Sequence, residues 1–277
     1  MVAWARPASL DQALAALAAD PSLRVVAGGT DVYPALAEAA PRTPMLDLSA
    51  LPLRGIARTR TGWCFGALTT WTDIARARLP APMRALQQAA VEVGSPQIQN
   101  AGTIAGNIVN ASPAADGTVA LLALDAQVEV AGPAPRRVPL ADFVLGPRKV
   151  ALNPGELVTA VHVPDPGDGA GGFLKLGARR YLVISIAMVA ASLRLDRGAI
   201  VQAGIAVGAC APVARRLAGL EARLQGVPLA QAAALVRPED AAGLAPISDV
   251  RADAAYRAEA VPVLVARLLE RLAREAT

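Results

Sequence analysis

The chain contains 277 residues with a formal net charge of +4, and hydrophobic residues make up 54% of it but aromatic residues only 3%. This length allows two or three lobes with cores of their own, and the alanine-rich apolar fraction indicates helices rather than membrane segments. The longest apolar run, residues 181–193, is too short to cross a bilayer. The 27 basic residues are dispersed, which argues against nucleic-acid binding. We therefore expect a soluble, cytoplasmic protein without a membrane span.

The first part of the chain predicts a small β-α-β lobe. Ser9 and Gln12 have the spacing of a helix cap, and Leu10, Leu14 and Leu17 follow at helical intervals. A strand is expected at 23–27, then a glycine turn at 28–31, a helix at 33–40 and a strand at 45–48. The glycine turn would lie at the carboxyl end of a strand.

The middle of the chain predicts a hairpin (55–58 and 63–66), helices (71–78, 82–93 and 119–124) and strands (127–130 and 156–163). Between the second and third helices lies GSPQIQNAGTIAGNIVNASPAAD, residues 94–116, whose Asn, Ser, Thr, Pro and Gly residues suit neither a long helix nor a buried strand. We predict a loop that presents its backbone. Residues 131–139 and 164–172 are expected to be surface loops.

The C-terminal part predicts three antiparallel strands, at 172–179, 184–196 and 199–208. Helices are expected to follow at 214–224, 229–235 and 252–273, the last kinked or restarted at Pro262. The complete pattern is α+β, and we predict lobes at 1–54, 55–168 and 169–277.

Two glycine turns are the strongest indication of a binding site. Gly28 and Gly29 follow a predicted strand, while Gly102 and Gly106 bracket a short segment of the polar loop. Glycine lets the backbone approach a ligand closely, and consecutive N–H groups can form an anion-binding nest. Each turn alone fits an ordinary connection between elements equally well.

Together the turns resemble a known family. VVAGGTDV (25–32) and QIQNAGTIAGNIVNASPAAD (97–116) resemble the FAD-binding subunit of the molybdenum hydroxylases, the group of xanthine dehydrogenase and carbon monoxide dehydrogenase. The likeness continues in GELVTAVHVP (155–164), FLKLGARR (173–180) and ISDVRADAAYR (247–257). It implies a two-lobed FAD-binding domain of the vanillyl-alcohol-oxidase (PCMH) type, followed by a C-terminal lobe with a three-stranded antiparallel sheet and helices.

The resemblance also implies which residues bind FAD. The first turn would hold the pyrophosphate through backbone N–H groups and the Thr30 hydroxyl, and the second would hold a phosphate or the flavin edge. The residues so assigned are Ala27, Gly28, Gly29, Thr30, Asp31, Thr103, Ile104, Ala105, Gly106 and Asn107. Ala105 stands where the family commonly has glycine, which is tolerable only if its φ is negative.

Three further residues carry implied roles. Asp116 would bind hydroxyls of FAD, with capping of the following helix as the rival role. Leu157, or its neighbour Val158, would contact the adenine or flavin, although strand packing explains either equally well. Lys175 would lie beside the isoalloxazine, or else be a solvated surface lysine. Val93 falls where some relatives have an aromatic residue against the flavin.

No residue is expected to act as an acid or base, because a flavin that relays electrons carries the redox chemistry itself. The single histidine, His162, is expected to be a core or edge residue, not a metal ligand. Cys64 and Cys210 are expected to be buried, reduced thiols, too few for an iron–sulfur cluster.

The resemblance implies an electron-transfer subunit of a larger oxidoreductase. A large subunit would carry molybdopterin and a small subunit two [2Fe–2S] clusters, and electrons would pass through FAD to NAD⁺, oxygen or another acceptor. The basic surface fits either ordinary solvation or docking to acidic partner subunits. Two alternatives remain at this point: a stand-alone flavin oxidoreductase of the same superfamily, and a non-catalytic assembly subunit that has lost FAD.

Overall fold

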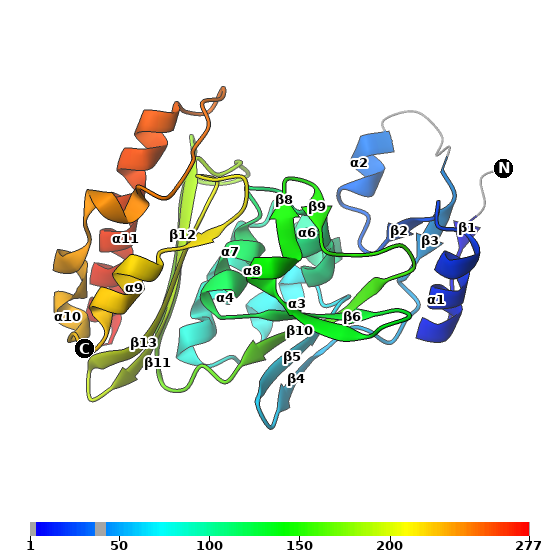
Figure 1. Ribbon diagram of the computed structural model, residues 1–277, viewed down its shortest axis with the longest axis horizontal. Helices are drawn as coiled ribbons and strands as arrows, with labels where there is room; N and C mark the ends of the chain where they lie inside the picture. Colours follow the sequence, from blue (N-terminus) through cyan, green and yellow to red (C-terminus); the bar gives the residue numbers. More distant parts are fainter. Residues whose placement is uncertain (1–3, 37–42, 277) are drawn as a thin grey trace.

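The computed structural model describes residues 4–36 and 43–276. Within these residues, three β-sheets and one short hairpin follow one another along the chain, and helices lie between and beside them (Figure 1). None of the described helices has the length and apolar character that spanning a bilayer would require.

The N-terminal lobe is built on a parallel sheet in the order β1-β3-β2. Its elements are β1 (Trp4–Ala5), α1 (Leu10–Ala19), β2 (Arg24–Val26), α2 (Val32–Leu36) and β3 (Met45–Asp47). Ser9 caps α1 by accepting a hydrogen bond from the Gln12 backbone N–H, as its sequence spacing predicts. Strand β1 was not predicted, and the end of the predicted helix at 33–40 lies outside the described residues.

The middle lobe contains a five-stranded antiparallel sheet in the order β4-β5-β10-β6-β7. Its strands are β4 (Ile56–Thr59), β5 (Gly62–Gly66), β6 (Gln127–Ala131), β7 (Arg136–Pro139) and β10 (Leu157–Pro164). The predicted hairpin is confirmed as β4 and β5. The prediction of a loop throughout 131–139 was wrong, because residues 136–139 pair with β6 at the sheet edge.

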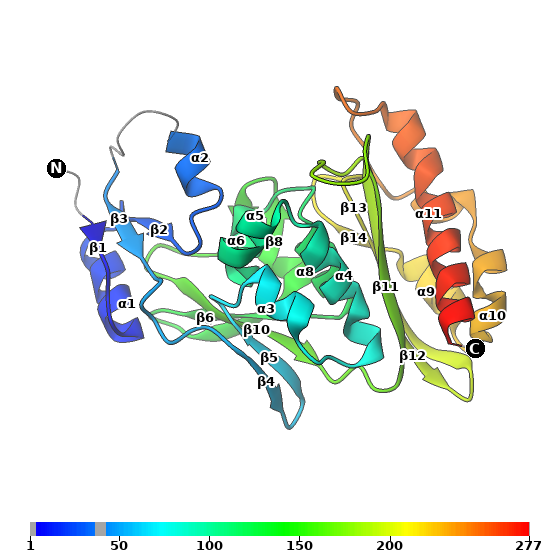
Figure 2. The same ribbon diagram turned by 180° about the vertical axis from the view of Figure 1, so that it is seen from behind.

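Helices cover this sheet on one side (Figures 1 and 2). They are α3 (Trp71–Arg76), α4 (Arg84–Glu92) after a 3₁₀ turn at Ala81–Met83, α5 (Pro96–Ala101), α6 (Ile104–Asn110), α7 (Asp116–Ala123) and α8 (Leu140–Phe143). A hairpin of β8 (Val144–Gly146) and β9 (Lys149–Val150) follows α8. The prediction of a loop over 94–116 was wrong, since α5 and α6 lie within it. Short helices become stable there because Ser95 and Thr103 cap them and because Ile104 and Ile108 are fully buried.

The C-terminal lobe has a sheet in the order β11-β12-β13-β14. Its strands are β11 (Gly169–Leu176), β12 (Ala187–Asp196), β13 (Ala199–Gly208) and β14 (Arg215–Arg216). The three predicted antiparallel strands are present, and the two-residue β14 adds a fourth that was not predicted. Its helices are α9 (Ala218–Leu224), α10 (Leu229–Ala232) and α11 (Ala254–Glu275), with 3₁₀ turns at Ala233–Leu235 and Pro238–Ala241. Helix α11 runs continuously through Pro262 without restarting.

Both faces of this last sheet are buried. Along β12, Met188 and Ala190 face the core shared with α4 and α7, while Ala187, Val189 and Ala191 face the core formed with α9, α10 and α11. This alternation is the two-residue period of a strand, with an apolar residue at each step. The C-terminal sheet therefore forms a wall of the middle lobe as well as the centre of its own lobe.

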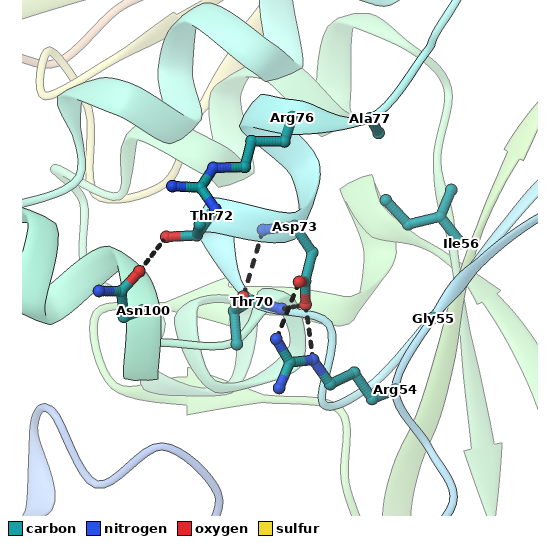
Figure 3. Close-up of a pocket in the computed structure, with 9 residues that line it drawn as sticks. All are labelled: Arg54, Gly55, Ile56, Thr70, Thr72, Asp73, Arg76, Ala77 and Asn100. Carbon is teal, nitrogen blue, oxygen red and sulfur yellow. Dashed lines mark hydrogen bonds and ion pairs between the residues drawn. The ribbon is translucent and has the colours of Figure 1, made fainter.

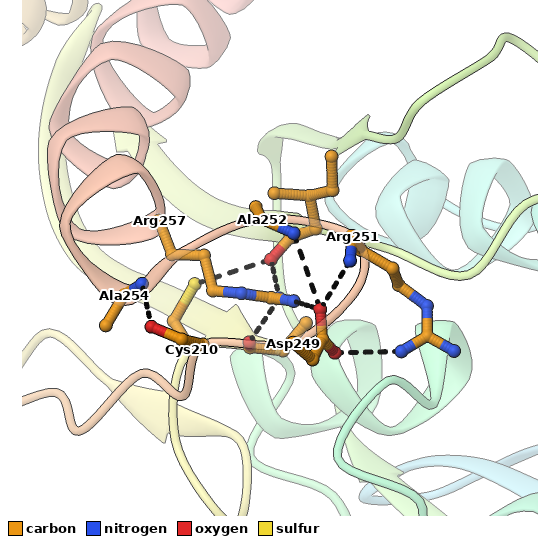
Figure 4. A network of polar contacts seen from close by, with 9 residues as sticks. Cys210, Asp249, Arg251, Ala252, Ala254 and Arg257 are labelled. Atoms are coloured by element: carbon orange, nitrogen blue, oxygen red, sulfur yellow. Dashed lines mark hydrogen bonds and ion pairs between the residues drawn. The ribbon is translucent and has the colours of Figure 1, made fainter.

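Arg257, in the first turns of α11, ties that helix to the ends of two strands. Its guanidinium is 2% exposed, donates to the carbonyls of Ile186 and Ala209, and pairs with Asp249 at 2.7 Å (Figure 4). The backbone N–H of Arg251, assisted by the two arginine side chains, lowers the pKa of Asp249 to about 2. The same cluster of contacts contains Cys210, whose thiol is buried as predicted, and burial raises its pKa to about 11. The same prediction was wrong for Cys64, which is only partly buried because it lies on β5 near the edge of its sheet.

Replacing Arg257 with methionine is expected to lower the free energy of unfolding by about 3 kcal/mol, because two buried carbonyls lose their donor and Asp249 loses a buried partner. The matched control is Arg251→Met, since Arg251 pairs with the same carboxylate from a more exposed position. The control should lose less than about 1 kcal/mol. Urea unfolding measures the free energy of unfolding of both variants. Equal losses would show that the buried contacts of Arg257 stabilise the fold no more than the exposed ion pair of Arg251.

Candidate functional site

A groove of about 620 Å³ lies between the N-terminal lobe and the middle lobe. One wall is the end of β2 with the turn after it, and the other is formed by α6 and the start of β10. Figure 2 shows α5 and α6 beside the lobe that carries α2. Cofactors are typically bound in pockets of about 300 to 1,000 Å³, so this groove has a suitable size.

Most of the residues singled out from the sequence line this groove. They are Ala27, Gly28, Gly29, Thr30, Asp31, Thr103, Ala105, Gly106, Asn107 and Leu157, and Val158 and Val93 line it as well. The two glycine turns, far apart in the sequence, are thus neighbours in space. Ile104, Asp116 and Lys175 do not line the groove: Ile104 points into the core, and the other two lie together elsewhere.

The first turn depends on glycine at two positions. A Cβ atom at Gly28 would lie 1.7 Å from the carbonyl oxygen of Ala101, which belongs to the rigid end of α5. Gly29 has φ +72°, in the left-handed region that other residues rarely adopt. The chain can therefore turn sharply at the end of β2 and touch the second turn with its backbone.

The first turn also offers free hydrogen-bond donors. The backbone N–H groups of Gly28, Gly29, Thr30 and Asp31 donate to no acceptor within the described residues. Across the groove, the side-chain amide Nδ2 of Asn107 is likewise without an acceptor in that part of the chain, while its Oδ1 accepts from the Thr118 hydroxyl at 3.3 Å. Five donors around one groove suit a phosphate or another anion.

The second turn differs from its prediction, because its backbone donors are used inside the protein. The N–H of Ile104 donates to Thr69 O at 2.9 Å, that of Ala105 to Ala67 O at 3.3 Å, and that of Gly106 to the Thr103 hydroxyl at 3.1 Å. The physical reason is that the segment begins a helix capped by Thr103 and docked on the loop before α3. The expectation of unobstructed N–H groups is wrong for this turn.

Ala105 fits its position without strain. It lies in the first turn of α6, and its φ is not positive. Alanine in place of the family's glycine therefore has no conformational cost there. Around it, Val93, Ile98, Val109 and Leu152 give the groove an apolar section suited to a flat ring system.

Asp116 and Lys175 form a buried ion pair between α7 and β11. The Lys175 Nζ lies 2.9 Å from Asp116 Oδ2, both side chains are 8% exposed, and the Ser185 hydroxyl donates to Asp116 Oδ1 at 3.1 Å. Burial raises the pKa of Asp116 to about 6, and the lysine opposes that rise. Two alternatives are excluded: Lys175 is no surface lysine, and the cap position of α7 is held by Ala115.

Several lining residues were not singled out from the sequence, among them Arg24, Trp71, Asn110 and Glu156. Trp71 is 1% exposed and packs against Gly102, beneath the meeting point of the turns. Glu156 is paired with Arg136 and accepts from the Asn153 N–H at 2.7 Å, so its charge is already balanced. Only the Thr70–Asp73 capping box marks this region in the sequence, and it indicates a helix start, not a groove.

A second cavity, of about 600 Å³, lies beside α3 (Figure 3). Its polar side chains bind one another: Arg54 pairs with Asp73 at 2.8 Å, and Thr72 donates to Asn100 at 2.6 Å. The Arg54 guanidinium holds the pKa of Asp73 at about 2. Because these groups are satisfied, the inter-lobe groove is the better candidate for a ligand site.

Fold and groove together define a protein whose N-terminal and middle lobes enclose a groove of cofactor size. Two family models match the chain: the FAD binding domain in molybdopterin dehydrogenase over residues 1–166, and the CO dehydrogenase flavoprotein C-terminal domain over residues 173–272. The chain belongs to the family of FAD-binding flavoprotein subunits of molybdopterin dehydrogenases, which are oxidoreductases.

Individual relatives agree with this assignment. The xanthine dehydrogenase FAD-binding subunit of Escherichia coli O157:H7 is 33% identical over 95% of this chain and 93% of its own length. The carbon monoxide dehydrogenase medium chain of Hydrogenophaga pseudoflava is 30% identical over 95% of this chain and 94% of its own. The fold matches a solved structure of Cu,Mo-CO dehydrogenase with a TM-score of 0.88 and 29% identity, covering 99% of this chain and 98% of that one. The predicted family and fold class are confirmed.

Proposed function

We propose that the inter-lobe groove binds FAD and that the chain acts as the electron-transfer subunit of a molybdenum hydroxylase. The observation that carries the proposal is the first turn, whose residues line a groove of cofactor size: four of its backbone N–H groups donate to no acceptor in the described part of the chain, and Gly28 lies against Ala101 of α5. FAD, when bound, supplies the redox chemistry. The chain's own residues would hold and orient it.

The lining suggests how these roles are divided. Gly28, Gly29, Thr30 and Asp31 would hold the diphosphate through their N–H groups, with the Thr30 hydroxyl and the Asn107 amide adding donors. The apolar section with Ala105, Leu157 and Val158 would exclude water from the ring system. Thr103 acts differently, since its hydroxyl caps α6 and so fixes the segment containing Gly106 and Asn107.

Asp116 and Lys175 would contribute from outside the groove lining. Lys175 places a positive charge at the junction of the middle and C-terminal lobes, where it would stabilise a reduced, anionic flavin. Asp116 holds that ammonium in place. The same proposal places lobe boundaries near residues 54 and 168, which is supported by the change of sheet after β3 and after β10.

The complete enzyme would contain two partner chains. Relatives bear the names "medium chain" and "FAD-binding subunit", which supports a large molybdopterin-binding subunit and a small [2Fe–2S] subunit as partners. Electrons would pass from the clusters through FAD to NAD⁺, oxygen or another acceptor in the cytoplasm.

Reconstitution of the purified chain with FAD tests the proposal. We expect one FAD per chain, measured by flavin absorbance and by FAD release on denaturation, and no substrate turnover without partner chains. A chain that takes up no FAD would contradict the proposal and favour an assembly role. Turnover by the isolated chain would favour a stand-alone flavoenzyme.

A further inference from the structure

A polar bridge joins the two lobes beside the groove, at two of its lining residues. Asn110, the last residue of α6, donates from Nδ2 to Asp31 Oδ1 at 2.8 Å. Arg148, between β8 and β9, donates to the Asn110 side-chain oxygen, lies 3.3 Å from the Asn110 carbonyl oxygen, and approaches Asp31 Oδ1 to 3.9 Å. We call Asp31, Asn110 and Arg148 the latch.

The backbone beneath the latch is held in an unusual conformation. Arg148 has φ +59° and Ala111, directly after Asn110, has φ +46°, and the Arg148 N–H donates to the Ala111 carbonyl at 3.0 Å. Left-handed conformations are uncommon for residues other than glycine, and such strain tends to persist at functional sites. The hydrogen bond between these two residues thus fixes the backbone from which the Arg148 side chain projects.

The charges around the groove explain why Asp31 needs a neighbouring cation. The charged lining residues are Arg24, Asp31 and Glu156, and Glu156 is already paired with Arg136. Asp31 therefore presents a carboxylate at the same turn whose N–H groups suit a phosphate. Without a neighbouring cation, that carboxylate would repel the anion that the turn is built to hold.

We propose that Arg148 is a positioning residue of the cofactor site, which neutralises Asp31 and, through Asn110, holds the two lobes closed over the groove. This inference rests on the proposed function. The latch bonds connect the two lobes directly, so the cofactor would gain affinity by meeting walls that are already held together.

The latch is not the sole attachment between the two lobes within the described residues. The lobes also share a small core in which Leu46 and Leu48 pack with Leu68 and Leu157. The apolar contact would keep the lobes together when the polar contact of the latch breaks. Dissociation of the cofactor should therefore depend on the latch more than overall folding does.

The test is the rate of FAD dissociation from the reconstituted full chain. Arg148→Met should raise this rate about fivefold, the upper range for an exposed ion pair. Asp31→Asn combined with Arg148→Met should recover part of the loss, since the uncompensated carboxylate is then gone while the contact of Arg148 with Asn110 stays absent. Rising salt should speed release from the wild type more than from Arg148→Met, because the pair is exposed to solvent.

Arg58→Met is the matched control. Arg58 forms an ion pair of similar exposure with Asp165, far from the groove lining, so its removal should leave FAD dissociation unchanged. A dissociation rate for Arg148→Met equal to that of the control, or a double variant that shows no recovery, would overturn the latch.

A second readout separates the latch from the proposed function. In the FAD-free chain, hydrogen exchange of residues 28–36 should be faster in Arg148→Met than in the wild type, because Arg148 no longer pairs with Asp31 or holds the Asn110 side chain that bonds the turn to α6. Unchanged exchange would overturn the latch whether or not FAD binds. Failure of the wild-type chain to bind FAD would instead overturn the proposed function.

Discussion

Replacing Gly28 with alanine is expected to weaken FAD binding about 100-fold. The added Cβ atom would lie 1.7 Å from the Ala101 carbonyl oxygen, and neither backbone can yield without moving the two turns apart. Overpacking of this kind costs about 3 kcal/mol at its upper range, which corresponds to the stated loss of affinity. Titration with FAD, followed by quenching of its fluorescence, measures the effect.

Gly243→Ala provides the control for the same chemical change. A Cβ atom at Gly243 would meet nothing within 4 Å, and its φ is not in the left-handed region. Its affinity for FAD should equal that of the wild type. If Gly28→Ala also binds FAD normally, then contact between the turns is irrelevant to the groove.

Replacing Lys175 with methionine is expected to destabilise the fold by about 3 kcal/mol near pH 8, because Asp116 is left charged and buried without a partner. The loss should shrink near pH 5. The pKa of Asp116 is about 6 in the folded chain, above its ordinary value of 3.8. Between pH 3.8 and about 6 the folded chain therefore binds more protons than the unfolded chain, so the free energy of unfolding rises as the pH falls through this range. Removing the lysine raises the pKa of Asp116 further and extends the range upward.

Urea unfolding at several pH values measures this effect, and the double variant Asp116→Asn with Lys175→Met isolates its cause. The double variant should lose the additional pH dependence, because no ionisable group remains in the pair. Ser185 and Glu92 also face the pair and remain in every variant. A Lys175→Met variant with the same deficit at both pH values would contradict the account.

Local periodicity predicted the elements that depend on their own sequence. The strand at 199–208 has the predicted bounds, since apolar residues fill most of it and turns flank it. Helices α5 and α6 were missed because each has at most seven residues, and helices so short need outside support: both are capped, by Ser95 and Thr103, and α6 is also buried through Ile104 and Ile108. Strand β7 was missed because an edge strand is stabilised by its partner, β6.

The candidate site was predictable where it rests on glycine turns and unpredictable where it rests on distant contacts. The sequence marks Gly28 and Gly29 clearly, and the structure brings them to the second turn. The pairing of Asp116 with Lys175 joins residues 59 positions apart, and that of Asp31 with Arg148 joins two lobes. No periodic pattern records such contacts, because they arise only when the sheets and helices have packed.

The sheet of β11 to β14 is buried on both faces, one against α4 and α7 and the other against α9 to α11. The interior of the flavin-binding half is consequently completed by strands that belong to a different sequence family. Loss or exchange of either half alone would expose the apolar face that it shares with the other half. The two halves therefore depend on each other for burial of their cores.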